Sequence, residues 1–159
     1  MKIKLALIAS IVLLTGCVAS VPERVVTKGP LICQADEICP ELSMLWNDEK
    51  RNGFKITAEI NNPEQFNITQ MNFIIDGQDY VYSTIQTTQF TKQETATTSS
   101  NSIVVPVSFL NSFRDAKQID LKIVTDKGNI ERPILTTAGH KSSAYLTFLK
   151  GYAGDDVAQ

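Results

Sequence analysis

Apolar and polar positions alternate along most of this chain, and a period of two predicts β-strands. Asn52-Gly53 and Asp76-Gly77 lie between alternating stretches, and both dipeptides favour tight hairpin turns because they accept positive φ values. A helix over residues 41–50, after Pro40, is the alternative for the first stretch. The strands predicted from the pattern cover residues 42–46, 54–60, 70–75, 80–85, 103–107, 119–123 and 130–136.

Two other stretches have the period of a helix. Ser108 is the expected N-cap of the first helix, and Ser142 is the expected N-cap of the second. Four apolar residues in each stretch share one helical face, namely Phe109, Leu110, Phe113 and Ala116, and Tyr145, Phe148, Leu149 and Tyr152.

Residues 86–102 follow neither pattern. This segment is rich in Thr, Ser and Gln, and Phe90 is its only large apolar side chain. The strand propensity of Thr favours an edge strand over residues 87–91. Residues 95–101 are expected to form a mobile loop.

The order of elements predicts the fold class. Strands, a helix, more strands and a second helix, joined by hairpin turns, favour an α+β domain. We expect an antiparallel β-sheet built of hairpins, with two helices packed on one of its faces. A β-sandwich with a peripheral helix is the alternative.

The N-terminus has a pattern of its own. Lys2 and Lys4 precede the apolar run of residues 5–14, which ends in Leu14-Thr15-Gly16-Cys17. Ten residues of helix cover about half of a ~30 Å hydrocarbon core, so the run favours a secretory signal over a membrane-spanning helix. The final tetrapeptide resembles the lipobox of bacterial lipoproteins.

This resemblance implies a processing step and a location. Residues 1–16 would be a signal peptide that is removed, and Cys17 would be lipidated and become the new N-terminus. Two or more acyl chains anchor a protein stably in a membrane. Val18, rather than Asp, follows the cysteine, and this implies the outer membrane, with the protein facing the periplasm.

The remaining chain divides into three parts. Residues 17–30 are expected to be the lipidated N-terminus and a tether, although Val25 and Val26 could instead add a short edge strand. Residues 31–154 are expected to form a single periplasmic domain, and residues 155–159 a disordered tail.

The cysteine count agrees with this division. If Cys17 carries lipid, then Cys33 and Cys39 remain in an oxidising compartment, and we expect them to form a disulfide. Their spacing differs from that of a Cys-x-x-Cys redox motif. A structural zinc site would need four ligands, and the single histidine, His140, lies about a hundred residues away.

The charge balance excludes some classes of partner. The chain has 15 Lys and Arg residues against 17 Asp and Glu residues, a net charge of −2. Because Lys2 and Lys4 lie in the signal peptide, the processed chain has a net charge of −4. Basic residues form no cluster, which argues against nucleic-acid binding and against a polybasic lipid site.

The sequence predicts no catalytic residue, metal ligand or cofactor. His140 is expected in an exposed loop, without the motif of a serine hydrolase. The paired carboxylates lie in turns or in the tail, where Asp is common for backbone reasons. These pairs are Asp76 with Asp79, Asp48 with Glu49, and Asp155 with Asp156.

The functional hypothesis is a non-enzymatic binding or accessory module for another envelope component, either a protein or a glycan. The predicted partner surface contains Tyr80, Tyr82 and Phe90, whereas Trp46 is expected in the core. The alternative is a small cell-envelope hydrolase that uses carboxylates.

Overall fold

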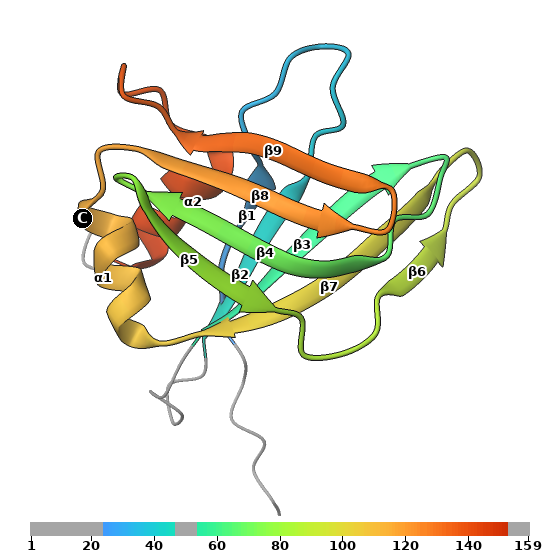
Figure 1. Cartoon of the computed structure of the whole chain (residues 1–159), viewed down its shortest axis with the longest axis horizontal. Helices are drawn as coiled ribbons and strands as arrows, with labels where there is room; N and C mark the ends of the chain where they lie inside the picture. The colour runs from blue at the N-terminus through green and yellow to red at the C-terminus, as the bar shows by residue number, and fades with distance from the viewer. Residues whose placement is uncertain (1–23, 47–53, 153–159) are drawn as a thin grey trace, which may run out of the picture.

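The computed structural model describes residues 24–46 and 54–152 (Figure 1). Within these ranges the chain forms nine strands and two helices. In chain order they are β1 (Arg24–Pro30), β2 (Glu41–Trp46), β3 (Phe54–Asn62), β4 (Ile68–Ile75), β5 (Gln78–Ser83), β6 (Gln89–Lys92), β7 (Thr97–Val105), α1 (Val107–Asp115), β8 (Ile119–Thr125), β9 (Gly128–Leu135) and α2 (Ser143–Tyr152).

The strands form two antiparallel sheets. One has the order β1-β2-β3-β7-β6 and the other the order β5-β4-β8-β9. Figure 1 shows the four-stranded sheet in front of the five-stranded sheet, with both helices together at one end. The predicted α+β class and the antiparallel pairing are confirmed. The strands divide into two layers, however, as in the sandwich that the sequence left as the alternative.

A single hydrophobic core lies between the two sheets. Alternate residues of β3 are buried, and β4, β7 and β8 contribute their inward side chains to the same cluster. The helices add aromatic rings to this core. Phe73 of β4 contacts Phe109 of α1 edge to face at 5.1 Å, and Phe113 meets Phe148 of α2 at 5.0 Å. Each such pair contributes about 0.5–1.5 kcal/mol beyond its area burial.

The hairpin between β4 and β5 has the predicted turn. Asp76 and Gly77 have φ values of 49° and 85°, as a type I′ turn requires. The Oδ1 atom of Asp76 also accepts hydrogen bonds from the backbone N–H groups of Lys117 and Gln118, at 2.9 and 2.8 Å. The other predicted hairpin turn, Asn52-Gly53, lies outside the described residues.

The mobile loop predicted over residues 95–101 is wrong, because most of this segment belongs to β7, between β3 and β6. Its alternate side chains Thr97, Ser99 and Asn101 are buried, and Ser99 and Asn101 bind backbone groups. Ser99 Oγ accepts from the N–H of Phe66 at 3.0 Å, and Asn101 Nδ2 donates to the carbonyls of Ile68 and Gln86, both at 2.9 Å. A polar composition therefore fits an inner strand face where the neighbouring chain needs hydrogen-bond partners.

The N-terminal tether is shorter than predicted. Residues 24–30 form β1, the edge-strand alternative, so the folded domain begins before residue 31. β1 also supports α2. An added Cβ at Gly29 would lie 2.9 Å from Ser143 Oγ and 3.0 Å from the backbone nitrogen of Ala144, so the start of α2 packs directly on the strand backbone.

One of the two predicted helix caps is confirmed. Ser142 Oγ accepts from the N–H of Tyr145 at 3.1 Å, which confirms it as the cap of α2. Ser108 is not the cap of α1. That helix begins at Val107, and its N-cap is Pro106, which makes no side-chain cap hydrogen bond. The helix alternative for residues 41–50 is wrong over residues 41–46, which form β2.

Candidate functional site

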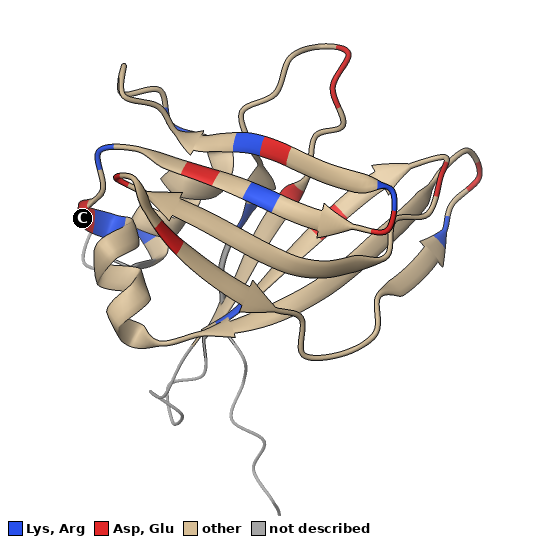
Figure 2. Cartoon of the chain, in the orientation of Figure 1, with Lys and Arg blue, Asp and Glu red and all other residues tan. Residues whose placement is uncertain are grey.

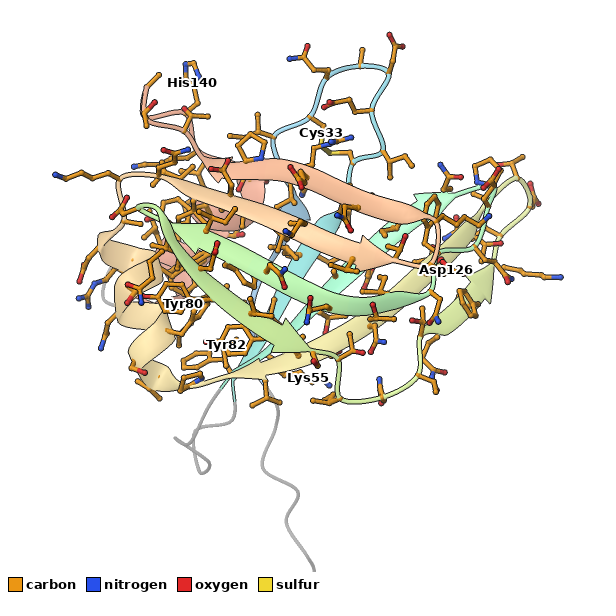
Figure 3. The ribbon with its side chains drawn as sticks, viewed as in Figure 1. Cys33, Lys55, Tyr80, Tyr82, Asp126 and His140 are labelled. Atoms are coloured by element: carbon orange, nitrogen blue, oxygen red, sulfur yellow. A yellow bond between two sulfur atoms is a disulfide. The ribbon has the colours of Figure 1, made fainter. Side chains whose placement is uncertain are left out.

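Tyr80 and Tyr82 share one face of β5, as predicted, but this face points inward. Their rings contact Phe109 of α1 edge to face, at 5.6 and 5.5 Å, and both side chains are half-buried (Figure 3). Burial, followed by the neighbouring Tyr80, raises the pKa of Tyr82. The outward aromatic patch predicted from these two residues is therefore not formed, because α1 covers them. Val81, between them, is the residue that is exposed.

Phe90 remains exposed, on the short edge strand β6. Its side chain is 43% exposed, and every residue of β6 is solvent-exposed. The edge strand itself confirms the prediction made for residues 87–91, with its start two residues later.

A polar groove of about 200 Å³ lies on the outer side of the five-stranded sheet, near the disulfide. We call it the polar groove. Four strands and the β6–β7 hairpin contribute to it, so its floor is held by ladder hydrogen bonds. Its lining residues are Lys28, Cys39, Glu41, Glu59, Asn61, Gln93 and Thr98.

Strand register explains the charges in the groove. Glu41 of β2 lies directly opposite Glu59 of β3, an arrangement that destabilises a sheet unless a cation intervenes. Lys28 of β1 supplies the cation. Its Nζ lies 3.5 Å from Glu59 Oε2 and 3.9 Å from Glu41 Oε2. Such exposed pairs contribute at most about 1 kcal/mol each. One ammonium group facing two carboxylates leaves the groove with an excess of negative charge.

Neutral polar groups complete the rim. Gln93, at the tip of the β6–β7 hairpin, donates from Nε2 to Thr98 Oγ1 at 3.1 Å. Asn61 is exposed at the end of β3. Amide and hydroxyl groups both donate and accept, so the rim can bind hydroxyl, amine or peptide groups of a ligand.

The disulfide loop closes one side of the groove. Cys33 and Cys39 are bonded, with Cα atoms 5.7 Å apart, as predicted. The N–H of Ile32 donates to the carbonyl of Pro133 in β9 at 3.1 Å. Arg132 Nε donates to the carbonyl of Ile38 at 3.1 Å and lies 3.3 Å from Glu37 Oε2. The loop therefore joins the two sheets along one edge.

Of the carboxylates singled out in the sequence, Asp76 and Asp79 do not line the groove. Asp76 binds backbone amides, and Asp79 is exposed on β5. His140 lies in an exposed loop before α2. Among the described residues, no group of three or more His, Cys, Asp or Glu side chains is placed to hold a metal ion. Several predicted positions lie outside the described residues, namely Cys17, the pairs Asp48 with Glu49 and Asp155 with Asp156, the tail 155–159 and the side chain of Trp46.

Sequence reasoning missed the Glu41–Glu59 pair. Both glutamates occupy outward positions on strands that the alternation predicted correctly. Their proximity depends on the register between β2 and β3, which the pattern alone does not fix. Figure 2 shows acidic and basic residues interspersed on β8 and β9 of the other sheet, with no large area of one sign.

Comparisons with known proteins add no relative. No protein-family model, no curated protein and no solved structure matches the chain. Neither helix in the described part of the chain has the length and apolar character needed to cross a membrane.

Proposed function

We propose that this chain is a lipoprotein of the bacterial outer membrane, anchored through Cys17 and facing the periplasm. Its domain serves as a non-enzymatic binding or accessory module for another envelope component. The lipobox resemblance supports the location, and the polar groove is the observation that carries the binding role.

The groove favours a partner of particular chemistry. Two carboxylates against one ammonium group suit a cationic segment, and the amides and hydroxyl of the rim suit hydroxyl or peptide groups. A basic segment of an envelope protein, or a glycan that carries amino groups, meets both conditions. Because the floor consists of paired strands, little conformational entropy is lost on binding.

Photo-crosslinking in the envelope tests the binding role. A photoreactive residue replaces Gln93, at the groove rim, in the full-length chain. The matched control carries it at Glu131, which is exposed on the other sheet. We expect a discrete adduct from position 93, identified by mass spectrometry, and its loss when Glu41→Gln and Glu59→Gln are combined. No adduct at position 93, or the same adducts from both positions, contradicts the binding role.

The anchor has a separate test. The intact protein from membranes should have Cys17 as its first residue, with a mass increment for acyl chains. The Cys17→Ser variant should leave the membrane fraction. A retained leader, or a Cys17→Ser variant that stays tightly bound to the membrane, contradicts the lipid anchor.

One observation favours the second candidate, a carboxylate hydrolase. Glu41 and Glu59 lie opposite each other on two strands that line a groove, and acid–base hydrolysis uses two carboxylates in a cleft. Purified protein that degrades peptidoglycan, and loses this activity in Glu59→Gln, would support it. Asp76→Asn does not test this candidate, since Asp76 has a structural role in the turn.

A further inference from the structure

The start of β1 limits how far the domain can lie from the membrane. If Cys17 is lipidated, as proposed above, residues 18–23 are the only ones between it and Arg24. Seven residue steps span at most about 25 Å when fully extended. The first residues of β1 must therefore lie within about 25 Å of the lipid-bearing cysteine.

The register of the strands shows which part of the domain the short tether would hold close to the membrane. Arg24 of β1 pairs with Trp46 at the end of β2, and Phe54 at the start of β3 pairs with Val105 at the end of β7. These four positions lie at one end of the five-stranded sheet. We call it the anchor end. The arrowhead of β7 marks it at the lower side of Figure 1.

Exposed apolar side chains gather near this end. Val104 is 51% exposed, and Val107, three residues later, is 37% exposed. Ile85 is 54% exposed, and its N–H donates to the carbonyl of Ser102, two residues before Val104, at 3.0 Å. These three are half of the six large apolar side chains that are exposed in the described part of the chain.

A cation accompanies the apolar residues. Lys55 of β3 pairs directly with Val104 of β7 and is labelled in Figure 3. Apolar side chains beside a lysine match the chemistry of a bilayer surface, where acyl chains lie beneath phosphate groups. A tether of seven steps keeps the local lipid concentration high, so weak contacts suffice for docking.

We propose that the anchor end docks on the bilayer that holds the Cys17 lipid, with Ile85, Val104 and Val107 in the headgroup region and Lys55 at the phosphates. The polar groove lies on the same face of the five-stranded sheet, farther from the membrane. Glu59 and Asn61 lie five and seven residues along β3 from Phe54, which places them about 16–23 Å from the anchor end. Docking thus presents the groove to partners in the periplasm.

Fluorescence quenching in vesicles tests this orientation. The full-length lipidated protein carries an environment-sensitive fluorophore at Val104→Cys or, as control, at Glu94→Cys in the hairpin at the far end of β7. Vesicles contain phosphatidylethanolamine and phosphatidylglycerol at 3:1, with or without brominated acyl chains. We expect brominated lipid to quench the label at position 104 at least threefold more than the label at position 94.

A pair of matched variants tests the contact itself. In the chain labelled at position 104, Val107→Asp should reduce quenching toward the value at position 94. Val81→Asp should leave it unchanged, since Val81 is 54% exposed on the other sheet.

Equal quenching at positions 104 and 94 in lipidated protein overturns the docking proposal and leaves the lipid anchor standing. Quenching that rises with the number of copies per vesicle overturns it in favour of contact between copies. An N-terminus without lipid overturns the proposed anchor as well.

Discussion

At the scale of single residues, buried polar side chains determine how the sandwich closes near the start of β7. Asn101 is 1% exposed, yet its amide Nδ2 reaches the carbonyls of Ile68 and Gln86 and lies 3.2 Å from Thr88 Oγ1. Its Oδ1 accepts from the N–H of Ser102. One side chain therefore binds backbone groups of β4, of β7 and of the segment after β5.

We predict that Asn101→Ala lowers the free energy of unfolding by about 2 kcal/mol, because the buried carbonyl of Ile68 and the part-buried carbonyl of Gln86 each lose a donor and a cavity forms. Urea unfolding followed by circular dichroism measures this loss. Asn129→Ala, at an exposed position of β9, is the control and should change stability by less than about 0.5 kcal/mol. Equal effects of the two substitutions would contradict the role given to Asn101.

The Tyr145 hydroxyl gives the fold a pH dependence. It lies 3.1 Å from the carbonyls of both Phe113 and Arg114, in the interior. Burial, then the carboxylates of Asp115 and Asp76, raise the pKa of Tyr145 above its ordinary value of about 10. Above that ordinary value the unfolded chain loses this proton before the folded chain does. The free energy that the protonated Tyr145 hydroxyl contributes to folding is therefore fully present below about pH 10, and it is lost as pH rises through the folded-state pKa.

We predict that Tyr145→Phe costs about 1 kcal/mol at pH 8, from the lost hydrogen bond. Above pH 10, the free energy of unfolding of the Tyr145→Phe variant should fall less steeply than that of the unsubstituted protein. Urea unfolding at pH 8, 9.5, 10.5 and 11 measures both slopes. Parallel curves for the two proteins across this range would show that Tyr145 does not titrate with folding.

At the scale of elements, the packing of α2 on β1 joins the last helix to the first strand. The contact is close because Gly29 has no side chain. We predict that Gly29→Ala lowers the free energy of unfolding by about 1–3 kcal/mol, since the new methyl group must displace the start of α2. Thermal unfolding measures the change. Leu146→Ala, on the exposed face of α2, should have little effect.

The strands and helices were largely predictable from the sequence because alternation and helical period report burial directly. β3 and β8 alternate as expected, and β4 does so after a register shift between Ile68 and Gln70. The error at residues 95–101 has a physical cause. Ser99 and Asn101 are buried because they bind backbone groups of Phe66, of β4 and of the segment after β5, and a local pattern contains no information about these distant groups.

The candidate site was less predictable than the fold. The disulfide was predicted from the cysteine count and the proposed compartment, but the polar groove depends on register and on segments distant in sequence. Lys28 and Glu59 lie 31 residues apart, and Gln93 comes from a third segment. The direction of Tyr80 and Tyr82 also required knowledge of where α1 packs, since either face of β5 was compatible with the pattern.

At the scale of the whole molecule, the disulfide loop fastens the two sheets along one edge through Ile32, Arg132 and Pro133. We predict that reduction of the Cys33–Cys39 bond lowers the free energy of unfolding by about 2 kcal/mol, the loop-entropy value for so short a ring. Urea unfolding with and without reductant measures this loss. A Cys33→Ala, Cys39→Ala double variant should not respond to reductant.

If the chain is exported as a lipoprotein, as proposed above, the contact between α2 and β1 has a consequence for its folding. A chain that is exported from its amino end presents β1 to the periplasm first and α2 last. Until residues 143–152 have crossed the inner membrane, β1 lacks the helix that covers it in the finished domain. Under this proposal the strand nearest Cys17 is among the last to be completed, and its contact with α2 forms only when the C-terminal helix is present.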